Sequence, residues 1–549
     1  MYRHPELGYD VLLLVLYFVS NPEFGLSSRD AIVSYALYEP EGSITLQLST
    51  PPHYSTKMAR SYLSDVTDEY YVDNKDSTTR SPSIRSNDGS VDSGFDHSDS
   101  EELQLLNHSA LNERSTKDHE LCTAPLVTRG AYLAAGAKDA FPQRGLLGAV
   151  VASESSSDPR IYLNTNAPFS ALVCGVQGSG KSHTVSVILE NMLISGYPAT
   201  GHLEKSLSGL VLHFGEGGSG GQPSEAAWLG SPIINTINAP KIVVYVAASS
   251  LRTMQAVYAK VGPHVVVEPL LFNKAELDAR AFLSLMAIES AESAPLYMQT
   301  VLSILRELGE DYSYGAFRTK LEVKKRDLQP AQLNGLKQRM ELLESFVDKT
   351  KKRAAPQRFD AGQLTIVDLS DPFIDSSSAC TFFEILVRLF VRAKIGTGKV
   401  LVVDEAHKYL ASNGGESGLT KELSSLIRQQ RHLGMRVIVS TQEPTVVPPI
   451  LLDLCSVAFL HRFSSPSWLA HVEKHVAAKM DSDEAFEKVV KLQTGQAVVL
   501  APSGLRTVTR GEGWDCDKDI LQHFGRDAVV IKTRQRVTRD GGASILVVD

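Results

Sequence analysis

From about Leu121 onward, short apolar runs alternate with amphipathic segments. The helical spacing of 3.6 residues appears at 296–309, 376–394 and 417–432, while the intervening runs are nearly continuous in Val, Ile and Leu. The runs read GLLGAVVAS, IYLNTN, GLVLHF, KIVVYV, HVVVEP, LTIVDLS, KVLVVDE, MRVIVST, VAFLHR and QAVVLA. Strands of this kind, separated by helices, are typical of a mainly parallel sheet that is buried on both faces. The pattern therefore predicts an α/β fold.

Changes in composition and hydrophobic pattern along the chain predict five parts. Residues 1–49 form a short segment of uncertain structure with a strand-like piece, ITLQLST, and residues 50–120 are Ser/Asp-rich and too poor in apolar side chains to fold, which predicts a disordered linker. A small β-rich lead-in at 121–168 precedes the α/β core at 169–502. The C-terminal extension, 503–549, ends in the strand-like ASILVVD, which either completes the sheet or packs on a neighbouring subunit.

Residues 318–358 interrupt the alternation with a basic, helical insert. It carries 12 Lys and Arg residues against 5 Asp and Glu residues, and it shows no strand pattern. Two interpretations are open: a solvated helical face, or a surface that contacts the phosphate backbone of a nucleic acid.

Composition narrows the class of protein. The 549 residues are 43% hydrophobic and 21% charged, as in globular proteins. The longest apolar run, Val11 to Val19, has nine residues, fewer than the roughly 18 of a membrane helix, and it lacks the flanks of a signal peptide. Five scattered cysteines indicate a reducing, intracellular compartment, either cytoplasmic or nuclear. The net charge of −8 comes from residues 1–120, with 9 basic and 20 acidic side chains, so the remainder is compatible with an anionic partner.

A complete phosphate-binding pattern, G-x-x-x-x-G-K-[ST], follows the apolar strand that ends at Cys174. Its glycines let backbone N–H groups point at phosphate oxygens, and the dipole of the following helix supports the negative charge. Lys181 would meet the β- and γ-phosphates, and the Ser182 hydroxyl would bind Mg²⁺. The alternative is a glycine-rich turn without a ligand. The predicted nucleotide-binding residues are Gly175, Val176, Gln177, Gly178, Ser179, Gly180, Lys181, Ser182 and His183, the last of which can equally be a packing residue.

Two acids end a later apolar strand, and a polar residue ends the next one. Asp404 would belong to the Mg²⁺ shell, and Glu405 would take a proton from the attacking water. Gln442 follows the strand that ends at Thr441, where an amide can reach the γ-phosphate and the water, although it can also simply cap the strand. Acids at the carboxyl end of a strand, together with the glycine loop, predict hydrolysis of ATP.

Three arginines lie downstream of these acids. Arg428 and Arg431 belong to a predicted helix, and Arg462 follows a later strand. Each could reach the γ-phosphate of a neighbouring subunit or form a surface salt bridge.

Taken together, these motifs resemble the HerA/FtsK superfamily of P-loop motor ATPases, and the HerA-like branch most. The similarity covers roughly Gly145 to Pro502 and rests on GVQGSGKS, LTIVDLS, VLVVDEAHKYL, ELSSLIRQQRHLGMRVIVSTQEP and TGQAVVLAPSG. The chain departs from the pattern at Glu443, where arginine is frequent, and in GLVLHFGEG, which lacks the Asp that often ends this strand.

The resemblance implies a RecA-like core that assembles as a homo-oligomer, a hexameric ring, with ATP and Mg²⁺ between subunits and double-stranded DNA drawn through a central channel. It implies the same roles for Lys181, Ser182, Asp404, Glu405 and Gln442. Alternatives are a related ATPase that moves or remodels protein, and a slow nucleotide-binding switch or scaffold.

Overall fold

The computed structural model describes two units, residues 1–96 and residues 97–549. In the first unit it describes four strands. In the second it describes 119–151, 158–215, 217–218, 220–286, 296–349, 357–410, 417–476, 482–509 and 519–542. The predicted disordered stretch therefore lies almost wholly outside the described residues, and so does the terminal ASILVVD run. None of the described helices combines the length and the apolar character that a membrane crossing requires.

The first unit contains a small antiparallel sheet. Its strands pair in the order β1-β2-β3-β4, so each pairs with the strand that follows it in the chain. The strand-like piece ITLQLST becomes β4. The strands are β1 (Tyr2–Arg3), β2 (Asp10–Leu16), β3 (Ile32–Tyr38) and β4 (Ile44–Ser49).

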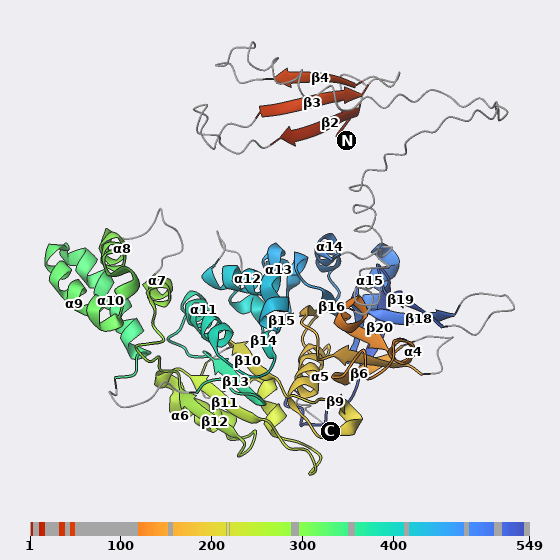
Figure 1. Cartoon of the computed structure of the whole chain (residues 1–549). Helices are drawn as coiled ribbons and strands as arrows, with labels where there is room; N and C mark the ends of the chain where they lie inside the picture. The colour runs from red at the N-terminus through yellow and green to blue at the C-terminus, as the bar shows by residue number, and fades with distance from the viewer. Residues whose placement is uncertain are drawn as a thin grey trace, which may run out of the picture. The chain divides into compact units, whose positions relative to one another are not determined.

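Eight parallel strands form one half of the large sheet in the second unit (Figure 1). The loop with the phosphate-binding pattern follows β8, the two acids follow β14, and β15 lies between these two strands and pairs with both. This strand order and the helices on both faces confirm the predicted α/β, RecA-like class. In sheet order the strands are β12 (Val265–Pro269), β11 (Lys241–Val246), β13 (Gln363–Asp368), β10 (Ser208–His213), β14 (Lys399–Val403), β15 (Met435–Thr441), β8 (Ser170–Cys174) and β16 (Val457–Leu460).

The other half of the sheet is mostly antiparallel. It joins strands from the predicted lead-in to strands from the C-terminal extension, because β20 pairs with β6 and β18 pairs with β5. The extension up to residue 542 thus completes the sheet. The strands follow in the order β17 (Gln496–Leu500), β20 (Ala528–Thr533), β6 (Arg144–Val150), β7 (Arg160–Asn164), β5 (Leu126–Thr128), β18 (Leu505–Thr509) and β19 (Asp519–His523), with β9 (Gly201–His202) beside β6.

Alternate residues of the central strands fill two separate cores. In β8, Leu172 and Cys174 pack with one core, while Ala171 and Val173 pack with the other. Both sets are buried because helices cover both faces of the sheet, which is why these strands read as continuous apolar runs. One face carries α5 (Lys181–Leu193) and α6 (Leu251–Tyr258), and the opposite face carries α11 (Ser376–Arg392), α12 (Gly418–Leu433), α13 (Pro449–Asp453) and α14 (Pro466–His475).

The basic insert is helical up to Ser345, as predicted, and this part belongs to a small bundle at one end of the unit (Figure 1); its residues 350–356 lie outside the described residues. Phe282 and Phe317 contact each other in its core, with ring centroids 4.1 Å apart. Several of its basic side chains pair with acids of the same bundle: Lys320 with Glu307 at 2.5 Å, and Arg318 with Glu344. The bundle consists of α7 (Ala279–Met286), α8 (Leu296–Leu308), α9 (Tyr314–Lys324) and α10 (Pro330–Ser345).

Candidate functional site

The predicted phosphate-binding loop connects β8 to α5, which begins at Lys181. Gly178 and Gly180 have φ values of +73° and +109°, a region that residues with a side chain rarely adopt. A Cβ atom on Gly180 would also lie 2.8 Å from the backbone nitrogen of Gly495. Glycine is therefore required at this position both by the backbone conformation and by the close approach of a second chain segment.

Lys181 is almost fully buried, with 4% of its surface exposed. Its Nζ donates a hydrogen bond to the Val176 carbonyl oxygen at 3.1 Å, so the ammonium lies inside the loop. Burial lowers the pKa of Lys181, and the negative charges of Glu405 and Asp404 oppose that shift. The lysine and the two predicted acids thus share one electrostatic environment, although more than 200 residues separate them in the chain.

A cavity of about 870 Å³ brings most of the predicted site residues together. It is lined by all five residues for which the sequence predicts a specific role: Lys181, Ser182, Asp404, Glu405 and Gln442. The predicted binding residues Gln177, Gly178, Gly180 and His183 line it as well. Gly175, Val176 and Ser179 do not; they shape the loop from behind, where the Ser179 hydroxyl donates to the Val176 carbonyl oxygen at 2.6 Å.

Asp404 is held by a histidine that the sequence did not suggest. His213 ends β10, and its Nδ1 lies 3.1 Å from Oδ2 of Asp404. Burial disfavours the charged imidazole, but the carboxylates of Asp368 and Asp404 outweigh burial and raise the pKa of His213 to about 9. The imidazolium also lowers the pKa of Asp404 against the opposing effect of burial. His213 therefore occupies the strand end at which the sequence lacks an Asp, and it keeps Asp404 ionised.

Glu405 is contacted by the side chains of Gln442 and His407. Nε2 of Gln442 donates to both carboxylate oxygens, at 3.1 and 2.8 Å. Nδ1 of His407 accepts the Gln442 backbone N–H at 3.3 Å, and Nε2 of the same ring lies 3.4 Å from Oε2 of Glu405. Glu405 itself has φ of +50°, an uncommon conformation for a residue with a side chain. Gln442 therefore does more than end its strand, since it fixes the position of the carboxylate.

The donor set suits Mg²⁺. The Ser182 hydroxyl and the Asp404 carboxylate are both hard oxygen donors that line the same cavity, and Mg²⁺ is usually bound by one or two such groups together with phosphate oxygens and water. No cluster of three or more His, Cys, Asp or Glu residues suited to a metal occurs among the described residues. Ser182 and Asp404 would leave the remaining coordination positions of a Mg²⁺ ion to phosphate oxygens and water.

The three predicted arginines lie apart from the cavity lining. Arg428 and Arg431 are exposed on α12, and Arg462 is exposed after β16. None of them is among the residues that line the cavity.

Sequence reasoning missed part of the cavity wall. Beyond His213, the missed lining residues are Lys408, close after the two acids, and residues from more distant segments: Gly215, Gly217, Gly220, Gly221, Gln222, Pro223, Glu225, Ser370, Thr494, Gly495, Lys532, Thr533, Gln535, Asp540 and Gly542. Only Lys408 had a sequence signal, namely its closeness to the two acids. The others reach the cavity through strand pairing and turns that no local pattern encodes.

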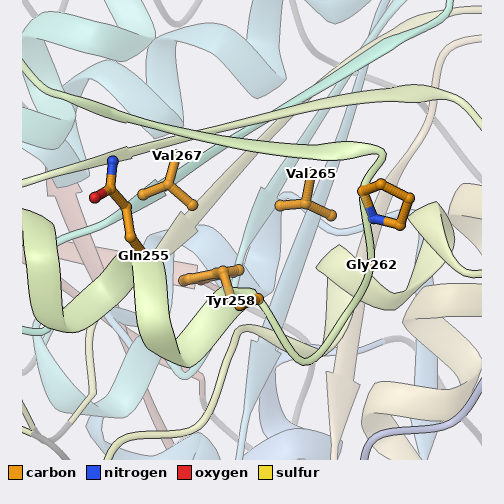
Figure 2. Close-up of a pocket in the computed structure, with 7 residues that line it drawn as sticks. Gln255, Tyr258, Gly262, Val265 and Val267 are labelled. Atoms are coloured by element: carbon orange, nitrogen blue, oxygen red, sulfur yellow. The ribbon is translucent and has the colours of Figure 1, made fainter.

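A second, smaller hollow of about 390 Å³ lies between α6 and β12. Figure 2 shows Gln255, Tyr258, Val265 and Val267 around it. Burial raises the pKa of the Tyr258 hydroxyl far above its usual range, and this hydroxyl donates to Asp368 at 2.6 Å. The hollow thus offers apolar side chains and the Gln255 amide, whereas the larger cavity contains the groups able to bind phosphate.

Comparisons with known proteins give structural similarities only. No family model and no curated protein matches the chain. Among solved structures, the genome packaging NTPase B204 from Sulfolobus turreted icosahedral virus 2, in complex with AMP, is 12% identical with a TM-score of 0.25, and the match covers 61% of this chain and 92% of that one. VirB4 of Thermoanaerobacter pseudethanolicus is 11% identical with a TM-score of 0.40, covering 72% and 97%. EccC of Thermomonospora curvata (ATPases 2 and 3) is 12% identical with a TM-score of 0.27, covering 72% and 41%. The fold class defined here, a RecA-like P-loop core, rests on the strand order and the loop geometry, not on these values.

Proposed function

We propose that this protein is an ATP-hydrolysing, ring-forming motor of the HerA/FtsK type that translocates double-stranded DNA. The observation that carries the proposal is a single cavity lined by Lys181, Ser182, Asp404, Glu405 and Gln442. A glycine loop at a helix N-terminus binds phosphate, and an ionised carboxylate beside it can activate water. A nucleoside triphosphate is the kind of substrate that uses both features, and we propose ATP.

In the proposed mechanism each side chain has one task. Backbone N–H groups of the loop and the Lys181 ammonium bind the β- and γ-phosphates. Ser182 and Asp404 would hold Mg²⁺, which would supply positive charge to the phosphate oxygens. Gln442 keeps the Glu405 carboxylate in place, and Glu405 accepts a proton from the attacking water. His213 keeps Asp404 oriented and ionised.

The proposal also includes assembly into a ring and a location inside the cell. The exposed Arg428, Arg431 and Arg462 are available to a neighbouring subunit in a hexameric ring. We place the protein inside the cell because its cysteines follow no disulfide pattern in the sequence.

One observation favours a second candidate, an ATPase that moves or remodels protein. Basic residues of the insert are paired with acids of their own bundle, as Lys325 is with Glu322 at 2.6 Å. Such pairs reduce the charge that the insert offers to a DNA backbone. The two candidates share the ATP site and differ in the polymer that stimulates it.

The test is an ATPase assay on the full chain, with and without double-stranded DNA. We expect Glu405→Gln to lower kcat by about 100-fold or more while ATP affinity changes little, because general-base removal affects the chemical step. Lys181→Ala should weaken ATP binding by more than about ten-fold, since it removes a charge-assisted contact with phosphate. Glu443→Gln is the matched control: Glu443 is exposed, adjacent to Gln442 and absent from the cavity lining.

DNA dependence separates the two candidates. A translocase should be stimulated by DNA, and the stimulation should fall steeply with salt because bound counterions compete for the phosphates. Stimulation by a protein and not by DNA would select the second candidate. Full activity of Glu405→Gln would refute the mechanism itself.

A further inference from the structure

The end of β20 and the chain that follows it run along the helix of the phosphate-binding loop. We call residues 532–542 the C-terminal segment. Oγ1 of Thr533 lies 2.9 Å from Oγ1 of Thr184, and the Arg534 carbonyl oxygen lies 2.8 Å from Nε2 of His183. These contacts place the segment beside the first turn of α5, the turn that begins with Lys181 and Ser182.

A fully buried carboxylate fixes the segment to this helix. Glu190 of α5 accepts hydrogen bonds from the Val537 N–H at 3.1 Å, the Thr538 N–H at 3.0 Å and the Thr538 hydroxyl at 2.6 Å. Nη1 of Arg534 donates to the same carboxylate at 2.7 Å. Charge-assisted hydrogen bonds inside a protein are the strong ones, so the position of the segment relative to the loop is well defined.

The outward side of the segment faces the cavity. Arg534 and Arg536 turn inward, toward Glu190 and Glu225, whereas Gln535 between them is exposed. Gln535 lines the cavity, as do Lys532, Asp540 and Gly542. The segment is therefore a wall of the cavity with an anchored back and a polar front.

The direction of a bound nucleotide follows from the rest of the lining. In the proposed function the γ-phosphate lies near Glu405 and Gln442, where Glu405 would activate the attacking water. The segment instead contacts α5 at His183 and Thr184, past the residues that bind the phosphates. The nucleoside of the same ligand then extends toward the C-terminal segment.

We infer that the C-terminal segment forms the nucleoside subsite of the ATP cavity, and that the Gln535 amide binds the edge of the adenine base. This inference rests on the proposed function. A side-chain amide carries a donor and an acceptor in one plane, which matches the amino group and the ring nitrogen of adenine. Guanine presents acceptors at both of the corresponding positions, so the same amide discriminates against it.

The test is equilibrium binding of ADP, GDP and pyrophosphate to the full chain with Mg²⁺, measured by calorimetry. ADP and pyrophosphate avoid turnover during the measurement. We expect Gln535→Ala to weaken ADP binding by about ten-fold, to leave pyrophosphate binding unchanged and to abolish the preference for ADP over GDP. Arg539→Ala is the matched control, because Arg539 is exposed in the same segment but absent from the cavity lining, and it should bind all three ligands like the wild type.

The outcomes are distinguishable. An unchanged ADP affinity in Gln535→Ala, or an equal loss of ADP and pyrophosphate binding, would overturn the inference. If the wild type binds neither ADP nor pyrophosphate, or if Lys181→Ala binds both as well as the wild type does, the proposed function fails instead.

Discussion

Removing the carboxylate of Glu190 should destabilise the protein strongly. In Glu190→Ala the guanidinium of Arg534 loses its partner at 2.7 Å, and Arg536, 3.9 Å from the same carboxylate, remains buried as well. Two backbone N–H groups and one hydroxyl also lose their acceptor. Breaking a buried ion pair by deleting one member costs about 3–5 kcal/mol, because a desolvated charge is left uncompensated. We expect a loss of this size in the free energy of unfolding.

A matched exposed pair makes the control. Glu487 lies in α15 (Ser482–Val490), and Lys491 directly follows this helix. Their charged groups are also 2.7 Å apart, but 68% of the Glu487 side chain and 73% of the Lys491 side chain are exposed. Glu487→Ala should leave the unfolding midpoint nearly unchanged, because solvent already screens that pair. The two variants thus compare equal distances at different burial.

Urea unfolding followed by tryptophan fluorescence measures both variants. Trp228 packs against Gly541 of the C-terminal segment, where an added Cβ would clash with its ring, so its emission reports on this region. Amide hydrogen exchange at Val537 and Thr538 gives a local readout, since both N–H groups donate to Glu190. A loss below about 1 kcal/mol with exchange unchanged would show that Glu190 does not anchor the segment.

Variants at two further positions, His461 and Lys399, test the core of the unit. Burial lowers the pKa of His461 to about 4, although its hydrogen bond to the Gln496 carbonyl oxygen opposes the shift. The pKa of this histidine in the unfolded chain is about 6.5, so protons bind preferentially to the unfolded chain as the pH falls from about 6.5 to about 4. Across that pH range the wild type should lose on the order of 3 kcal/mol of unfolding free energy relative to His461→Gln, measured by urea unfolding. A constant difference between the two proteins would contradict this. Nζ of Lys399 donates to three carbonyl oxygens at the end of α11, those of residues 390, 391 and 393. Lys399→Met should therefore lower the melting temperature, and Lys399→Arg should lower it less. Equal melting temperatures for the wild type and Lys399→Met would show that these bonds contribute nothing.

The local residue pattern is sufficient to predict the helices and strands of the core and the motifs placed on them. The helices expected at 296–309, 376–394 and 417–432 are α8, α11 and α12, and each of the apolar runs from GLLGAVVAS to QAVVLA falls on a strand of the large sheet. These segments are predictable because a buried strand or an amphipathic helix must show its period in the sequence. The glycine loop and the acid pair were found for a related reason: their chemistry needs fixed residue types at fixed spacing.

The partners of the acids were not predictable in this way. His213 reaches Asp404 only because β10 pairs with β14 in parallel register, with Leu212 opposite Val403. Gln442 reaches Glu405 because β15 lies beside β14. A histidine or a glutamine at the end of a strand has no local feature that reveals which neighbour it will meet.

Residue pattern and motif spacing alone predict the α/β core, the phosphate-binding loop and the two acids at the end of a later strand. Tertiary contacts alone make residues 532–542 a wall of the same cavity, held by Glu190 more than 340 residues earlier. The physical reason is that periodicity and motif spacing act over a few turns of chain, whereas the cavity is created by strand pairing and by one buried carboxylate that fix distant segments in contact.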